Sequence, residues 1–312
     1  MARIVVVGSF NMDLVVRMPA IPRPGETLLG GIFATYPGGK GSNQAVAAAR
    51  LGGKVAMIGR VGADAFGDQL LTMARREGID TRFVGVDSHV ATGVALIQVD
   101  AQGQNSIAVA SGANFSLTAA EVATAFAQLE RVDLLIMPLE TPIDTILTAA
   151  ELARQAGARV LLNPAPAQHL PPELLKNVDV LIPNEYEAAF MTGIAIHSPH
   201  DARQAAAHLL QCGPGSVIVT MGSRGALIAE PAQSEIIYAQ TPAFSVKAVD
   251  TTAAGDCFVG ALAVALGEGH SLATAARFAS AAAALSVTRI GAQPSLPTRA
   301  EVEEFLGARS LS

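Results

Sequence analysis

The sequence of 312 residues has little charge and few of the residues that mark several large classes of protein. Charged residues make up 15% and apolar residues 50% of the chain, which argues against intrinsic disorder. The net charge is −6, so no basic excess predicts nucleic acid as a partner. The two cysteines, Cys212 and Cys257, lie far apart and outside any C-x-x-C pattern, which is typical of a reducing compartment and argues against a disulfide framework.

Long apolar runs are also missing. The longest, around residues 258–266 and 278–287, are too short to span a bilayer. Residues 1–3 lead directly into an apolar run of strand length, without the hydrophobic region of a signal peptide. We therefore expect a soluble, cytoplasmic protein with no membrane partner.

Three common motifs are absent. No G-x-G-x-x-G follows the first apolar run, which argues against a dinucleotide fingerprint. Lys40 lies in a glycine cluster that lacks the spacing of a P-loop, and no G-x-S-x-G nucleophile elbow is found. His197 and His200 flank Pro199 in a polar segment, which favours a solvated loop over a metal site.

Strand-like and helix-like segments alternate along most of the chain. Residues 4–8 form a continuous apolar run ended by a glycine, as in a central parallel strand. From residue 117 the alternation is regular, with strands expected at 134–137, 160–162, 180–182 and 217–220. The sequence therefore predicts one α/β body over residues 1–312, with an antiparallel extension at 225–229 and 235–238.

Two segments break the alternation because no helix separates their strands. Residues 14–16 and 27–33 are strand-like and are separated by prolines, and residues 93–99 and 106–109 form a similar pair. We predict two hairpins, at about 13–36 and 93–111, that pair with each other into one small sheet.

The most informative segment is Asp250-Thr251-Thr252-Ala253-Ala254-Gly255-Asp256, which leads into an apolar helix expected to begin at about Gly255. The first turn of a helix leaves backbone N–H groups unpaired, and small residues let an anion reach them. An acid beside such an anion hole can accept a proton while the hole holds negative charge. In the alternative interpretation, Asp256 only stabilises the first helical turn.

Further polar residues follow the other predicted strands, at the edge where open α/β sheets bind ligands. They are Asn11, Asp13, Gly39, Lys40, Asn43, Glu140, Asn184, Thr220, Gly222, Ser223 and Gly225. Asparagine, aspartate and lysine at one edge favour a polyhydroxylated ligand read by hydrogen bonds, and glycine turns favour phosphates or a flat base. Singly, Asn11 and Asn184 could equally be turn residues.

Two stretches resemble the signatures of the ribokinase-like, or pfkB, family of sugar kinases. They are Gly38-Gly39-Lys40-Gly41-Ser42-Asn43-Gln44-Ala45 and the segment from Asp250 to Asp256. Asn11-Met12-Asp13, Asn163-Pro164-Ala165-Pro166 and Pro183-Asn184-Glu185 add to a resemblance that covers essentially the whole chain. Ala253 departs from the pattern, since many members have glycine there. We expect the anion hole to survive, because alanine needs only a permitted backbone conformation.

The resemblance implies a three-layer α/β/α sandwich with a small lid sheet, and ATP-dependent phosphorylation of D-ribose at its 5-hydroxyl. Asp256 would be the base, and the N–H groups around Ala253, Ala254 and Gly255 would hold the transferred phosphoryl group. The implied sugar-side residues are Asn11, Asp13, Gly39, Lys40, Gly41, Asn43, Glu140 and Asp256. The implied nucleotide-side residues are Asn184, Thr220, Gly222, Ser223, Gly225, Gly255 and Ser280.

The resemblance also implies two metal ions and a partner. Mg²⁺ would accompany ATP, and an activating K⁺ would be held by the side chains of Asp250 and Ser295 and the carbonyls of Thr252, Ser286, Arg289 and Gly291. The two hairpins would cover the sugar and mediate a homodimer. Two alternatives stay open: a kinase for another sugar or a nucleoside, and a catalytically silent sugar-binding relative.

Overall fold

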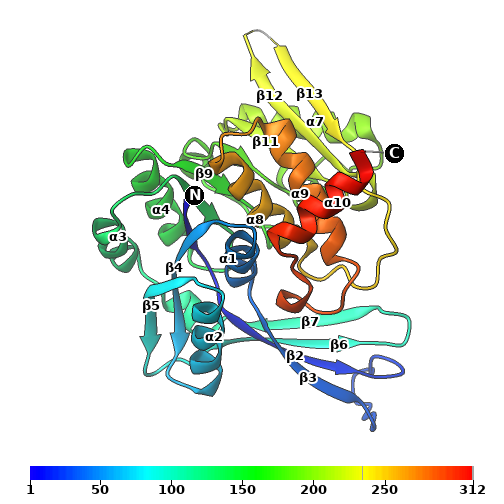
Figure 1. Ribbon diagram of the computed structural model, residues 1–312. Helices are drawn as coiled ribbons and strands as arrows, with labels where there is room; N and C mark the ends of the chain where they lie inside the picture. The colour runs from blue at the N-terminus through cyan, green and yellow to red at the C-terminus, as the bar shows by residue number, and fades with distance from the viewer. Residues whose placement is uncertain (234, 311–312) are drawn as a thin grey trace.

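The computed structural model describes residues 1–233 and 235–310, which form two sheets and the helices around them (Figure 1). The large sheet has nine strands in the order β13-β12-β11-β10-β9-β8-β1-β4-β5. Its strands are β1 (Arg3–Val7), β4 (Lys54–Gly62), β5 (Asp80–Asp87), β8 (Leu134–Met137), β9 (Arg159–Leu162), β10 (Val180–Leu181), β11 (Ser216–Thr220), β12 (Ala226–Ala232) and β13 (Glu235–Thr241). Neighbours from β11 to β5 are parallel, whereas β12 and β13 are antiparallel, as the sequence predicts.

Helices cover both faces of this sheet and create two apolar cores. One face carries α1 (Lys40–Arg50), α2 (Ala65–Arg76), α8 (Ala254–Gly267), α9 (Leu272–Ser286) and α10 (Arg299–Ser310). The other carries α3 (Ala119–Gln128), α4 (Ile143–Gln155), α5 (Pro172–Leu175), α6 (Glu185–Thr192) and α7 (Pro199–Gln211). Strand β1 contributes side chains to both cores, because successive residues of a strand point to opposite faces: Ile4 packs into the first core and Val5 into the second. The expected three-layer α/β/α sandwich is confirmed. No helix of the described part is long and apolar enough to cross a membrane.

The small sheet lies beside the body, at the bottom of Figure 1, in the order β3-β2-β6-β7. Its strands are β2 (Asn11–Arg17), β3 (Ile32–Gly38), β6 (Gly93–Val99) and β7 (Asn105–Ala110). Each hairpin is antiparallel, and the parallel pairing of β2 with β6 joins the two. The strand expected at 27–33 instead begins at Ile32, because Gly30 takes a φ of +89° that interrupts the extended backbone.

The chain passes between the body and the small sheet at four places, and these places meet around Asn11 and Asn114. This residue lies in the short 3₁₀ helix η1 (Gly112–Ser116) that follows β7. Its side chain accepts a hydrogen bond from the Phe10 N–H (2.8 Å) and donates to the Phe10 carbonyl (2.9 Å) and to Asn11 Oδ1 (2.8 Å). A Cβ on Gly93 would lie 2.4 Å from Asn114 Nδ2, so only glycine fits at the start of β6.

Helix α8 begins at Ala254, one residue before the expected start, and its N-cap Ala253 is left-handed, with φ +58° and ψ 12°. The sequence interpretation assumed an ordinary backbone conformation for this alanine. A left-handed conformation costs a residue with a Cβ about 1 kcal/mol relative to glycine. The turn therefore forms as expected, but with local strain that glycine would avoid.

Candidate active site

Asp256 lies buried in the first turn of α8 and is held by two amides from the first turns of α1. Its Oδ2 accepts a hydrogen bond from Asn43 Nδ2 (3.0 Å), and its Oδ1 accepts one from Gln44 Nε2 (3.0 Å). The two helices approach closely, because a Cβ on Gly260 would lie 2.7 Å from the Gln44 carbonyl oxygen. The carboxylate is therefore fixed in orientation from both sides.

The charges around Asp256 are unbalanced. Burial raises the pKa of Asp256, and the Lys40 ammonium and the amides of Asn43 and Gln44 oppose that rise. Burial alone would lower the pKa of Lys40, but the surrounding carboxyl groups raise it, so the lysine remains an ammonium. These carboxyl groups belong to Asp256, Glu140, Glu187 and Asp13. The site thus holds one lysine among four acidic side chains.

The turn before α8 leaves backbone donors without acceptors. Within the described residues, the N–H groups of Ala253, Gly255 and Asp256 have no hydrogen-bond partner, whereas the Ala254 N–H donates to the Thr251 carbonyl (3.2 Å). Three unpaired donors thus lie where the sequence interpretation places an anion hole, but the Ala254 N–H that it included is already used. A Cβ built on Gly255 would meet no atom within 4 Å, so the space beside these donors is open. This arrangement is suited to an anion.

Asp13 and Asn43 each present an acceptor group near Asp256 that has no donor in the described structure. The carboxylate of Asp13 receives no hydrogen bond, although the residue is 9% exposed, and Asn43 Oδ1 is buried without a partner. Burial, with the negative charges of Glu140 and Asp256, raises the pKa of Asp13 to about 7. Buried acceptors without donors indicate a ligand that donates, as the hydroxyl groups of a sugar do.

The remaining sugar-side residues surround these acceptors. Glu140, after β8, accepts hydrogen bonds from the Lys40 N–H (2.9 Å) and from the Ser9 hydroxyl. Gly41 must be glycine, since its Cβ would lie 2.5 Å from the Ser9 nitrogen, and Gly39 has a φ of +89°. The structure thus brings together the predicted Asn11, Asp13, Gly39, Lys40, Gly41, Asn43, Glu140 and Asp256.

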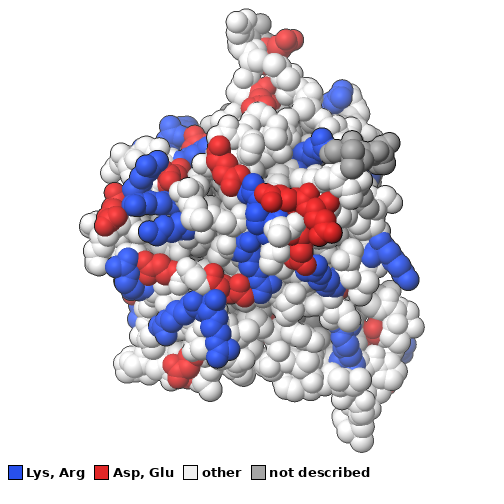
Figure 2. Space-filling view, in the orientation of Figure 1, with Lys and Arg blue, Asp and Glu red and all other residues white. Residues whose placement is uncertain are grey.

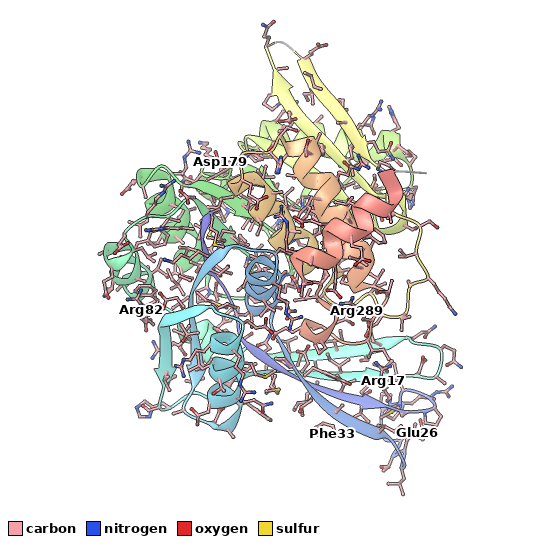
Figure 3. All side chains as sticks on the ribbon, viewed as in Figure 1. Arg17, Glu26, Phe33, Arg82, Asp179 and Arg289 are labelled. Atoms are coloured by element: carbon pink, nitrogen blue, oxygen red, sulfur yellow. The ribbon has the colours of Figure 1, made fainter. Side chains whose placement is uncertain are left out.

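A cleft of about 330 Å³ opens beside Asp13, between the small sheet and the body. Asp13, Val15 and Tyr36 line it from the small sheet, and residues 248–252 and 290–292 line it from the body. Figure 3 labels Arg17 on the small sheet and Arg289 on the body side of this region. A second cleft, of about 450 Å³, lies at the N-terminal ends of β1, β8 and β9, and none of the predicted site residues line it.

The residues predicted to contact the nucleotide lie after β10 and β11, apart from Gly255 on α8 and Ser280 on α9. Asn184 caps α6 in a capping box with Glu187, and it pairs with Thr220 through an isolated parallel bridge. Gly222 and Ser223 form the short helix η2 (Gly222–Arg224) that follows. A Cβ on Gly225 would lie 2.1 Å from the Thr241 carbonyl, so packing requires this glycine. Ser280 lies on α9, which packs against β12 and β13.

Some of the residues expected to hold K⁺ are joined to one another by hydrogen bonds. Asp250 accepts hydrogen bonds from the N–H (3.0 Å) and the hydroxyl (2.6 Å) of Thr252 and from the Gly291 N–H (3.0 Å). The hydroxyls of Ser286 and Ser295 donate to carbonyls three residues earlier in their own turns. The Arg289 side chain turns away to pair with Glu301, and its backbone N–H donates to the Ser286 carbonyl (3.1 Å).

Sequence reasoning missed three polar side chains that contact the predicted residues, namely Ser9, Gln44 and Asn114, and it also missed Asn163, which contacts Gln44. Gln44 lies within the first family signature and Asn163 within a supporting motif, but neither position was assigned a role. Asn114 lies about a hundred residues from its partners Phe10 and Asn11, so no local spacing connects them. Glu187 was also missed, although the pattern Asn184-x-x-Glu187 marks its capping box.

A substitution of Asp13 tests whether its carboxylate, which receives no hydrogen bond, destabilises the ligand-free protein when it is charged. Replacing Asp13 with asparagine should stabilise the ligand-free protein at pH 8 by a few kcal/mol at most, because the folded wild type then holds a poorly solvated charge. The pKa of about 7 is raised above the unfolded value. The wild type therefore gains stability as the pH falls below about 7, and the advantage of the variant should shrink towards pH 5. Urea unfolding at both pH values measures this, and an equal difference at both would contradict it.

The surface gives no sign of a nucleic-acid site on the face shown in Figure 2. Lys and Arg side chains alternate there with Asp and Glu, and several arginines pair with acids, as Arg50 does with Glu77 and Arg299 with Glu303. The tip of the small sheet is largely uncharged in the same view.

Comparison with known proteins places this site in a family. A family model described as the pfkB family carbohydrate kinase matches residues 1–299. The ribokinase of Haemophilus influenzae is 46% identical over 96% of this chain and 97% of its own, and a deoxyribokinase of Salmonella typhi is 38% identical over 97% and 98%. Among solved structures, Arabidopsis thaliana ribokinase complexed with ribose and ATP matches with a TM-score of 0.88 at 34% identity, over 98% of this chain and 99% of that one. The chain belongs to the pfkB family of carbohydrate kinases.

Proposed function

We propose that this protein transfers the γ-phosphoryl group of ATP to the 5-hydroxyl of D-ribose, giving ribose 5-phosphate and ADP. The observation that carries the proposal is the position of Asp256. Its buried carboxylate lies in the same helical turn as the unpaired N–H groups of Gly255 and Asp256 and shares Asn43 with the cluster of donor-free acceptors. A base, an anion hole and a hydroxyl-binding site therefore meet at one point.

The chemistry follows from these groups. Asp256 accepts the proton of the sugar hydroxyl as its oxygen attacks the γ-phosphorus, and the bond from that phosphorus to the ADP oxygen breaks. The N–H groups of Ala253, Gly255 and Asp256 and the ammonium of Lys40 face the charge that develops on the phosphoryl oxygens. Phosphoryl transfer depends mainly on such positioning and electrostatic stabilisation.

Ribose is favoured over other sugars by the paired acceptors. Asp13 and Asn43 Oδ1 suit a ligand with adjacent hydroxyls, and the identity of 46% to a ribokinase supports the same substrate. The main alternative is deoxyribose, because a deoxyribokinase is also similar over nearly the whole chain. ADP release measured with ribose, deoxyribose, fructose and nucleosides tests the assignment. We expect the highest kcat/KM with ribose, and a higher value with deoxyribose would replace ribose by that sugar.

The loop at Asp250 fits a monovalent cation. Burial alone would raise the pKa of Asp250, but hydrogen bonds from Thr252 and Gly291 lower it, so the group is a carboxylate with a lone pair to spare. Asp250, Ser295 and the carbonyls of Thr252, Ser286, Arg289 and Gly291 would hold K⁺ through oxygen alone. The ion would supply positive charge beside the anion-hole turn. Mg²⁺ would enter with ATP, bound mainly by phosphate oxygens and water.

The cation proposal predicts a change of activity with salt identity. Replacing NaCl by KCl at constant ionic strength should raise kcat several-fold. An oxygen site that selects cations by size would bind K⁺ better than Na⁺, and the bound ion would hold the loops at Asp250 and Gly291 in one arrangement. The same ADP-release assay measures it, with choline chloride as the control without a binding cation. Equal rates in potassium, sodium and choline would remove the cation from the mechanism.

The small sheet is proposed to act as a lid and as a dimer interface. Its inner face carries Asp13 and lines the cleft, so closure over the sugar would exclude water from the phosphoryl group. Its outer face presents Phe33 and Leu96, which are 61% and 53% exposed. The register places both on the face opposite Asp13. Such an apolar face favours a homodimer through the small sheet, which sedimentation velocity would detect.

A further inference from the structure

Gln44 connects Asp256 to the end of the large sheet through a chain of buried amides. Its side chain is fully buried, and Nε2 donates to both Asp256 Oδ1 (3.0 Å) and Asn163 Oδ1 (3.1 Å). Asn163 Nδ2 donates in turn to the carbonyl of Ile182 (2.9 Å). Asn163 follows β9 and Ile182 follows β10, so this series of hydrogen bonds runs from α8 through α1 to the centre of the sheet.

The backbone carbonyl at the end of this chain fixes the orientation of every member. A carbonyl oxygen only accepts, so Asn163 must present its Nδ2 to Ile182 and its Oδ1 to Gln44. Gln44 must then present its Nε2, because Oε1 would otherwise face two acceptor oxygens. Both N–H bonds of that amide are therefore used, one on Asn163 and one on Asp256.

This orientation gives the Asp256 carboxylate a hydrogen bond but leaves the side-chain oxygen of Gln44 without one. Gln44 Oε1 is buried and has no hydrogen-bond partner within the described residues. Unpaired buried acceptors are uncommon in folded proteins and call for a reason. The reason here is the hydrogen bond that Gln44 Nε2 donates to Asp256, because a hydrogen bond to a carboxylate is stronger than one to a neutral group.

We propose that Gln44 is a positioning residue for the phosphoryl-transfer base. It holds Asp256 Oδ1, so that Oδ2, which Asn43 alone contacts, faces the substrate hydroxyl. It also stabilises the ionised carboxylate and so opposes the rise in the pKa of Asp256 that burial causes. The inference rests on the proposed role of Asp256 and adds a role for a residue that touches neither substrate.

Replacing Gln44 with methionine tests the proposal, because methionine has a similar length and no donor. We expect the acid limb of the pH profile for single-turnover phosphoryl transfer to move up by about one pH unit. The sign follows from the lost donor, which raises the pKa of the base. The rate at neutral pH should fall roughly 10- to 100-fold, while the KM for sugar should change by less than about threefold, since Asn43 remains.

Ser216→Ala is the matched control. It removes a partly buried hydrogen bond, from Ser216 Oγ to the Asp179 carbonyl (2.9 Å), at the N-terminal end of β11. It should leave the pH profile unchanged whatever it does to thermal stability. Asn163→Leu is the second variant, used if Gln44→Met does not fold. It frees the Gln44 amide to rotate, so it should move the acid limb in the same direction but less far.

The outcomes separate this proposal from the one on which it rests. A Gln44→Met enzyme with the wild-type acid limb, or one whose rate loss is the same at every pH, overturns the positioning role. If Asp256→Asn retains the wild-type rate, the base itself is wrongly assigned. If the acid limb is shifted in Gln44→Met but is that of the wild type in Asn163→Leu, the positioning role belongs to Gln44 alone. The hydrogen bonds from Gln44 through Asn163 to Ile182 would then have no part in it.

Discussion

Asp256→Asn should reduce the rate of phosphoryl transfer roughly 10³- to 10⁴-fold while the sugar still binds. Asparagine keeps the size of the side chain but cannot accept the proton of the sugar hydroxyl. It also offers one acceptor oxygen to the two donors, Asn43 Nδ2 and Gln44 Nε2, that now hold the carboxylate. We therefore expect a small loss of sugar affinity beside the large loss of rate. Rapid-quench kinetics and titration calorimetry with ribose measure the two separately.

The matched control is Asp179→Asn, a residue labelled in Figure 3 that lies directly before β10, at the N-terminal end of that strand. Its carboxylate also accepts hydrogen bonds, from the Val160 N–H (2.7 Å) and from Arg154 (3.2 Å). It should change stability without changing the rate. A loss of only a few-fold in Asp256→Asn would mean that the substrate hydroxyl loses its proton to another group. The alternative in which Asp256 only stabilises the first turn of α8 would then stand.

Gly255→Ala should remove most phosphoryl-transfer activity and leave the fold intact. The new methyl group would meet no protein atom within 4 Å, and alanine in a helix is about 0.5–1 kcal/mol more favourable than glycine. The methyl group would instead occupy the space in front of the unpaired N–H groups, where the phosphoryl group must lie. Loss of access to one such donor costs roughly 10²- to 10³-fold in rate. A melting temperature at or above the wild-type value would accompany the loss.

Two other glycines provide the comparison. Gly307 lies in α10, and its Cβ would also meet no atom within 4 Å, so Gly307→Ala should stabilise the protein and leave activity unchanged. Gly260 lies in α8 itself, where a Cβ would lie 2.7 Å from the Gln44 carbonyl, so Gly260→Ala should destabilise the protein. If Gly255→Ala turned over ATP at the wild-type rate, the open space would have no part in catalysis.

The parts of this structure that were predictable from sequence are those set by local pattern. An apolar run ended by glycine located β1, the regular alternation after residue 117 located the later parallel strands, and the change from extended to helical sequence located the turn before Asp256. The start of β3 was misplaced because residues 27–29 are compatible with a strand, and only the conformation of Gly30 excludes it. The left-handed Ala253 was not predictable either, since propensity disfavours that conformation for alanine.

Contacts between distant segments account for what was missed in the site. The Gln44–Asp256 bond joins residues 212 positions apart, and the Asn114–Asn11 bond joins residues 103 apart. No spacing rule reaches across such distances. The Ala254 N–H was assigned to the anion hole because sequence cannot show that the Thr251 carbonyl takes it. Residue types alone therefore indicated which chemistry to expect, but not which atoms remain free to perform it.

The meeting of four chain segments around Asn114 limits how the small sheet can move. Because the side chain of Asn114 ties Phe10 and Asn11 to the segment after β7, the two hairpins cannot swing separately without breaking buried hydrogen bonds. The small sheet would instead rotate as one plate about a short axis through these crossings. Gly39 and Gly112, with φ of +89° and +52°, lie in two of these crossings, after β3 and after β7. A rotation that carries Asp13 towards the body would thus be coupled, by geometry alone, to the orientation of the Asn11 amide.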